Sequence, residues 1–172
     1  VTIADMPSIP IPRGIPGPNL LSHICVGKYA DHLPLARQLK QYARLGVELP
    51  PSTLNGWVNK GASSLIKPLC EVERKRISEK RYLMVDESPT KIMIKGNNKG
   101  KLHQGYFWLY YSPLDKEIFI DYQHGRSRSG PDEILKNFTG WLQTDGYSVY
   151  EHFGEKEGIK HIQCMAHARR YF

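Results

Sequence analysis

The change of pattern at Arg81 is the feature that most constrains the fold of this chain. Before Arg81, apolar residues recur three and four positions apart, as on one face of a helix, whereas after it they form short strand-like runs. We expect helices at 19–30, 33–44 and 64–79, and a further one that Ser52 or Thr53 caps. We expect strands at 82–85, 91–95, 105–111, 117–122, 141–145 and 159–163, and helices at 131–138 and 148–153. These patterns predict an α/β fold, a mixed sheet with flanking helices, preceded by a small helical region.

The same patterns divide the chain into three parts. Residues 1–18 are rich in proline and glycine, which indicates an extended arm or linker. Residues 19–80 are helical, and the short helices within 33–60 resemble a helix-turn-helix, which indicates DNA binding. Residues 81–172 form the mixed sheet, with turns predicted at 87–90 and 96–100.

Charge and composition narrow the class of protein. The 172 residues are 40% apolar, enough to bury a core, and the net charge is +7. Most of the excess lies in residues 1–80, so nucleic acid is the expected partner of that part, although an ordinary basic protein is the alternative. The three widely spaced cysteines predict no disulfides, and no segment has the length of a membrane span, so we expect a cytoplasmic protein.

Two aspartates each follow an apolar strand-like run, and they lie 59 residues apart. These are Asp86, after Tyr82–Val85, and Asp145, after Trp141–Thr144. Carboxylates from separate strands can converge to bind Mg²⁺, which takes one or two protein carboxylates and completes its coordination with substrate phosphate. The alternative is that both are turn residues, since Asp-Gly at 145–146 is a common turn signal. Glu87 is a weaker candidate because it faces the other side if the strand continues.

Five ordered motifs carry a resemblance to a known family. The chain contains Lys28–Leu35, Gly46–Leu54 with Trp57, Val85–Pro89, Leu142–Tyr147 and Cys164–Phe172. Together they resemble the transposases of the insertion sequence 66 family over almost the whole chain. The resemblance implies a ribonuclease-H-like core of the DDE type, in which three acids hold two Mg²⁺ or Mn²⁺ ions. It also implies DNA partners (terminal inverted repeats and target DNA), a homo-oligomer on that DNA, and a place at the bacterial nucleoid.

The resemblance makes Asp86 the first catalytic and metal-binding acid and Asp145 the second. Ser88 stands where a threonine is usual. The third acid, a glutamate, has no match before Phe172, so the chain is expected to be a piece cut from a longer protein and inert by itself. Glu151, Glu155 and Glu157 precede the last strand and are not assigned that role.

Other residues are candidates for DNA contacts or for structure. The predicted DNA-binding residues are Arg126, Arg169, Arg170, Ser52, Thr53 and Lys60. Arg126 is alternatively a loop arginine in solvent, and Arg169 and Arg170 alternatively flank a helix packed on the sheet. Cys164 and His167 form a possible structural pair, since a CxxH pair supplies half of a tetrahedral zinc site, but a packed cysteine beside a polar histidine is the plainer interpretation.

Three hypotheses for function remain. The first is a fragment of a DDE transposase that cuts and joins DNA ends by metal-dependent phosphoryl transfer. The second is a non-catalytic DNA-binding module based on residues 33–60. The third is a degenerate remnant of a mobile element without activity.

Overall fold

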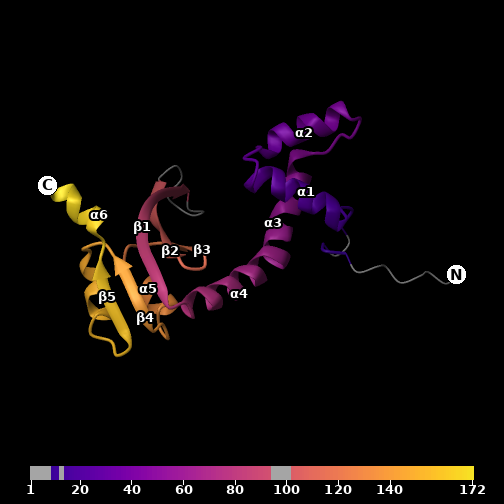
Figure 1. The fold of residues 1–172 in the computed structure, drawn as a ribbon. Helices are drawn as coiled ribbons and strands as arrows, with labels where there is room; N and C mark the ends of the chain where they lie inside the picture. The colour runs from indigo at the N-terminus through magenta and orange to yellow at the C-terminus, as the bar shows by residue number, and fades with distance from the viewer. Residues whose placement is uncertain (1–8, 12–13, 94–101) are drawn as a thin grey trace. The chain divides into compact units, whose positions relative to one another are not determined.

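The computed structural model describes residues 9–11, 14–93 and 102–172, which form two compact units, Val1–Glu71 and Val72–Phe172 (Figure 1). Most of the predicted arm, residues 1–8 and 12–13, and the predicted turn at 96–100 lie outside the described residues. Helix α4, Lys67–Ser78, contains the boundary between the units. The predicted domain limits at 18 and 80 therefore stay predictions.

The described part of the first unit includes the helices α1 (Pro18–Tyr29), α2 (Leu35–Arg44) and α3 (Pro51–Gly61). Helices α1 and α3 begin at prolines, whose fixed φ suits a first helical position. The first helix was expected from residue 19, but α1 begins one residue earlier, and Gly17 is its N-cap. Ser52 and Thr53, either of which was expected to cap the third helix, both lie inside the first turn of α3, so neither is its N-cap.

A small apolar core holds the first unit together. Its buried members come from α1, from α3 and from the loop before α1: Ile11, Leu21, Ile24, Leu54, Trp57 and Val58. Leu35, Leu39 and Tyr42 of α2 pack against them. After α3 the chain continues through η1 (Ala62–Ile66), a π-helical turn, into α4.

The second unit is built on a five-stranded mixed sheet, which confirms the predicted fold class. The strands are β1 (Tyr82–Met93), β2 (Leu102–Ser112), β3 (Glu117–Gln123), β4 (Gly140–Thr144) and β5 (Ile159–Gln163), in the order β3-β2-β1-β4-β5. β1, β2 and β3 are antiparallel neighbours, whereas β4 is parallel to β1 and β5 to β4. This arrangement is compatible with a ribonuclease-H-like core.

Strand β1 is longer than predicted, and the prediction of a turn at 87–90 is wrong. Glu87 pairs with Trp108 and Pro89 with Tyr106, so β1 runs without interruption beside β2. Beyond Met84, no described strand pairs with the β4 side of β1. Proline is tolerated at such an unpaired edge because its missing N–H is not needed there, and Ser88-Pro89 therefore does not break the strand.

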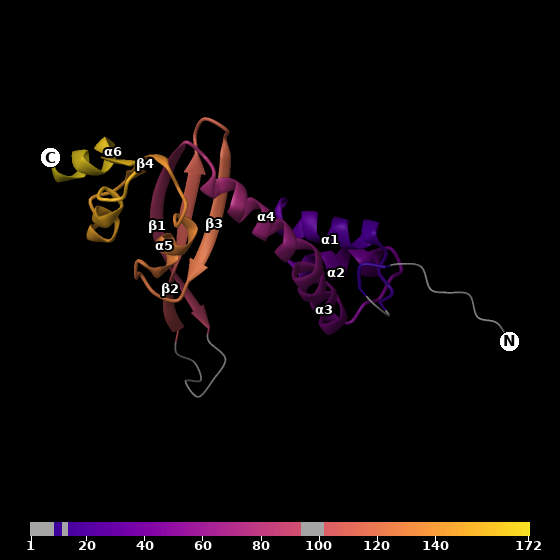
Figure 2. The same ribbon diagram turned by 90° about the horizontal axis from the view of Figure 1, so that it is seen from below.

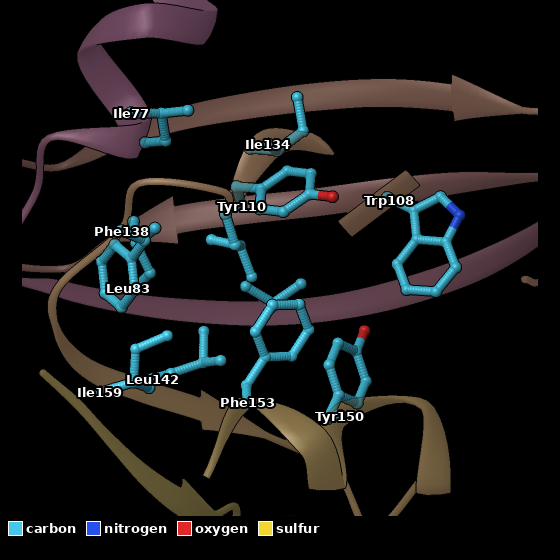
Figure 3. Close-up of a cluster of buried hydrophobic side chains, with 12 residues drawn as sticks. Ile77, Leu83, Trp108, Tyr110, Ile134, Phe138, Leu142, Tyr150, Phe153 and Ile159 are labelled. Atoms are coloured by element: carbon cyan, nitrogen blue, oxygen red, sulfur yellow. The ribbon is translucent and has the colours of Figure 1, made fainter. Parts of the chain in front are cut away.

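Short helical segments cover one face of this sheet. They are α5 (Ser129–Ile134), which lies across the strands in Figure 2, and η2 (Ser148–Phe153), a 3₁₀ turn. Trp108, Tyr110 and Phe153 are fully buried in the core between these segments and the sheet (Figure 3). The chain ends in α6 (Met165–Ala168) and η3 (Arg169–Tyr171).

The two faces of the sheet differ in burial. Leu83 and Val85 of β1 and Leu142 of β4 belong to the core. Side chains alternate along a strand, so the intervening residues face the other side. On that side Tyr111, Ile118 and Trp141 are more than a third exposed. The candidate site lies on this open face.

Candidate functional site

The sheet topology brings Asp86, within β1, close to Asp145, which directly follows the neighbouring strand β4. Met84 of β1 is in parallel register with Gln143 of β4. Asp86 and Asp145 each lie two residues further along, and neighbouring strands are about 4.8 Å apart. Both aspartates line one cavity of about 290 Å³. The structure therefore brings together the two acids that the sequence analysis singled out.

Asp86 presents its carboxylate to solvent, with a side chain that is 56% exposed. Its Oδ1 accepts a hydrogen bond from the Glu87 backbone N–H at 2.9 Å, and its Oδ2 lies 3.7 Å from His167 Nε2. Asp86 does not close a strand as predicted, since β1 continues to Met93. An exposed carboxylate with few internal partners keeps lone pairs for a ligand.

Asp145 directly follows β4 and has a second, local role. Its Oδ1 accepts a hydrogen bond from the Tyr147 backbone N–H at 2.9 Å, which is the contact of an Asx turn. The turn interpretation of Asp145 thus describes a real contact. That contact also orients the carboxylate, because it restrains one oxygen and leaves the other without a hydrogen bond among the described residues.

Cys164 and His167 line the same cavity as the two aspartates. Cys164 is the N-cap of α6, and hydrogen bonds from the His167 backbone N–H and then from the His167 ring lower the pKa of Cys164 to about 7. His167 Nδ1 is buried without a hydrogen-bond partner in the part of the chain that is described. Cys164 and His167, the pair predicted from the sequence, are therefore in contact with each other, and His167 lies next to Asp86.

The donor set fits a hard cation only in part. Two carboxylates suit Mg²⁺ or Mn²⁺, which can complete their coordination with water and substrate phosphate. Within residues 9–11, 14–93 and 102–172, no group of three or more His, Cys, Asp or Glu side chains is arranged to hold a metal ion. Asp86 and Asp145 would therefore hold such an ion with substrate or further ligands, and a zinc site at Cys164 and His167 gains no support.

Sequence reasoning missed the role of Glu87. Its side chain is only 2% exposed, on the core face of β1. Its carboxylate accepts hydrogen bonds from Arg126 Nε at 2.8 Å and from the Tyr150 hydroxyl at 2.8 Å. An acid in step with the buried Leu83 and Val85 was the available signal, because an acid on an apolar face requires a partner.

Arg126 and Tyr147 connect Glu87 to the turn that contains Asp145. The Arg126 guanidinium lies 3.9 Å from the centre of the Tyr147 ring, and the Tyr147 hydroxyl donates to the Arg126 carbonyl at 3.0 Å. Burial disfavours the charged Arg126, but its hydrogen bond and attraction to Glu87 leave its pKa raised. Burial, together with the charge of Glu87, raises the pKa of Tyr150. This network is built around a buried carboxylate.

The other predicted DNA contacts fall at different places. Arg126 is half-exposed but paired with Glu87. Arg169 and Arg170 are exposed in η3, and Arg170 lines a hollow of about 740 Å³ together with Asp145 and His167. Ser52, Thr53 and Lys60 lie on α3 in the first unit, where Ser52 and Lys60 are exposed. Of these predicted DNA contacts, only Arg126 and Arg170 line a hollow together with Asp145.

None of the described helices is both long enough and apolar enough to span a membrane.

Comparison with known proteins identifies the family of this chain. The family model described as "Transposase IS66 family" matches residues 13–172. The chain is 32% identical over 186 residues to "Uncharacterized protein y4qI" and 30% identical over 166 residues to "Uncharacterized protein y4jD", both of Sinorhizobium fredii (strain NBRC 101917 / NGR234). These alignments cover 100% and 89% of this chain but 34% and 32% of the relatives, so the chain spans about a third of their length. The match over residues 13–172 confirms the resemblance seen in the sequence motifs: the chain belongs to the IS66 transposase family.

Proposed function

We propose that Asp86 and Asp145 are the first two metal ligands of a transposase site that cuts and joins DNA ends by phosphoryl transfer. The observation that carries this proposal is that one carboxylate on β1 and another directly after the parallel neighbour β4 line one cavity on the open face. Membership of a transposase family supports the same conclusion. The chain covers about a third of its relatives, so the further ligands would come from outside it.

Each residue of this site has a separate task. When bound, a pair of Mg²⁺ or Mn²⁺ ions would activate the attacking oxygen and stabilise the leaving one. Asp86 offers an exposed carboxylate, and the turn contact to Tyr147 orients that of Asp145. Arg170, beside Asp145 in the larger hollow, would bind a backbone phosphate of the DNA, as would the exposed Arg169. The predicted phosphate contact of Arg126 would compete with its ion pair to Glu87.

Binding of DNA by the first unit is a second, compatible function. Ser52 and Lys60 are exposed on α3, and Thr53 is half-buried near its start. Hydroxyl and ammonium groups on a helix after a turn are common DNA contacts. We propose these three residues as contacts to terminal-repeat DNA. Tight duplex binding by residues 1–71 alone would support a binding role separate from the acids.

Titration of Mn²⁺ into the chain by calorimetry tests the metal site. We expect the Asp86→Asn, Asp145→Asn double variant to lose the binding seen with the unmodified chain, because the amides carry no charge. Asp31→Asn is the matched control, since it removes an exposed carboxylate from the first unit. Equal binding by the unmodified chain and the double variant would contradict the proposal.

The third acid is expected outside this chain, and we therefore propose that the 172 residues alone are catalytically inert. A cleavage or strand-transfer assay on labelled duplex DNA with Mg²⁺ should show no turnover above background. Turnover that disappears in the Asp86→Asn variant would show that the chain contains a complete site.

A further inference from the structure

Helix α2 has two faces of opposite character. Leu35, Leu39 and Tyr42 pack on the core of the first unit. Arg37, Lys40 and Arg44 are exposed, and their spacing of three and four residues places them on the opposite face. At 1.5 Å per residue, this cationic row extends about 10 Å along the helix.

A buried glutamine fixes the rotation of α2 about its axis. Gln38 is 2% exposed, and its Nε2 donates to the carbonyls of Ile24 at 3.2 Å and Leu33 at 3.1 Å. Gly27 of α1 permits this approach, because a Cβ added there would lie 3.2 Å from Gln38 Nε2. Since Gln38 holds one side of α2 against α1, the row of cations is held outward.

The three cations have no acidic partner in the described part of the chain. None of them forms an ion pair there, and no Asp or Glu occurs between His32 and Val47. In the second unit, by contrast, Arg74 and Arg76 pair with glutamates. Like charges three and four residues apart on a helix destabilise it, and an anionic ligand would relieve that repulsion.

The row also borders a shallow hollow. Its volume is about 160 Å³, and its lining consists of Leu33, Arg37, Lys40, Gln41 and Arg44. Three cationic groups and one amide donor around a hollow suit the oxygens of a phosphate group, which guanidinium and ammonium groups bind through charge-assisted hydrogen bonds.

We propose that the outward face of α2, formed by Arg37, Lys40, Gln41 and Arg44, binds the phosphate backbone of duplex DNA. The proposal rests on the DNA-binding function proposed above and adds a surface on a different helix from Ser52, Thr53 and Lys60. Phosphate contacts carry little sequence information, so this face supplies affinity and orientation, while sequence selection falls to other residues.

Fluorescence anisotropy with a labelled duplex of terminal-repeat sequence, and with a scrambled duplex, tests this surface over a range of salt concentrations. The test variant is Arg37→Gln, Lys40→Gln, Arg44→Gln, which removes three charges and keeps good helix formers. The matched control is Lys91→Gln, Lys116→Gln, Lys136→Gln, which removes three exposed charges without ion pairs among the described residues. Arg37→Lys, Arg44→Lys keeps the charge and changes only the shape of the donors.

Neutralising the row should weaken binding to both duplexes by about tenfold or more at 0.1 M salt. It should also lower the slope of log affinity against log salt by roughly 2 to 3, since each phosphate contact contributes about 0.9. The control triple should change the slope by less than about 1, and the lysine variant should keep it. A test triple with unchanged affinity and slope, in a chain that binds DNA, would overturn the proposal. Absence of duplex binding by the unmodified chain would overturn it too, while the Mn²⁺ titration would still test the metal site separately.

Discussion

The two faces of β1 hold neighbouring carboxylates with opposite environments. The Glu87 side chain is 2% exposed and accepts hydrogen bonds from Arg126 and Tyr150, whereas the Asp86 side chain is 56% exposed and accepts one backbone hydrogen bond. The Glu87 carboxylate is hydrogen-bonded to side chains within the fold, whereas the Asp86 carboxylate keeps lone pairs for a ligand. The comparison teaches that burial, more than residue type, separates a structural acid from a candidate ligand on this strand.

Removal of the buried acid should have the largest effect. Glu87→Ala leaves the Arg126 charge and the Tyr150 hydroxyl without their partner, so we expect a loss of about 3 kcal/mol in the free energy of unfolding. Urea denaturation followed by tryptophan fluorescence measures it. Glu155→Ala, at an exposed position, is the control and should change stability by less than about 0.5 kcal/mol. A loss below about 1 kcal/mol for Glu87→Ala would break the contrast between the faces.

A smaller loss of stability is expected when the Tyr150 hydroxyl, which donates a hydrogen bond to Glu87, is removed. Tyr150→Phe keeps the buried ring and removes a donor to a charged group, which should cost about 1.5 kcal/mol. If the network acts as a unit, the double variant with Glu87→Ala should lose less than the sum of the two single losses. Strict additivity, measured by the same denaturation, would show that the two side chains act independently.

On the open face, the thiol of Cys164 should ionise at a lower pH than an ordinary cysteine. Because hydrogen bonds from His167 lower the pKa of Cys164 to about 7, the thiolate should form as the pH rises through 7, where an unperturbed thiol titrates near 8.5. The stabilisation tied to this ionisation is present at high pH and is lost as the pH falls through 7. Alkylation rates of the Cys164 peptide, measured by mass spectrometry from pH 5 to 10, should have a midpoint near 7. His167→Ala removes the ring and keeps the backbone N–H, so it should move the midpoint only part of the way upward. An unmoved midpoint would remove the His167 ring as a cause.

The smallest change in stability is expected at Asp86. Asp86→Asn replaces an exposed carboxylate that no described ion pair of good geometry restrains, so unfolding should change by less than about 0.5 kcal/mol. Thermal unfolding of this variant and of the unmodified chain measures the difference in stability. A loss of 2 kcal/mol or more would mean that Asp86 is a structural acid like Glu87.

Much of the sheet could be predicted from the sequence because its strands carry local signals. The strand predicted at 159–163 matches β5, and the one at 117–122 matches β3 to within a residue. The continuation of β1 through Pro89 could not be predicted, since it depends on which edge of the strand is unpaired. Helix α5 ends at Ile134, earlier than the predicted 138.

The acids of the candidate site could be predicted from the sequence, but the contacts around them could not. Asp86 and Asp145 follow from apolar runs and from motifs, which are properties of the sequence. The pairing of Glu87 with Arg126 joins residues 39 positions apart and depends on the tertiary fold. The cationic face of α2 depends on the rotation set by Gln38, which a helical pattern alone does not indicate.

The central claim is that Asp86 and Asp145 together bind a divalent cation on the open face of the sheet. Paramagnetic broadening of backbone amide signals by substoichiometric Mn²⁺, in a two-dimensional NMR spectrum of the labelled chain, locates such a cation directly. We predict that signals of residues around Asp86 and Asp145 broaden first, and that the Asp86→Asn, Asp145→Asn variant loses this localised broadening. Broadening centred elsewhere, or unchanged in the double variant, would contradict the claim.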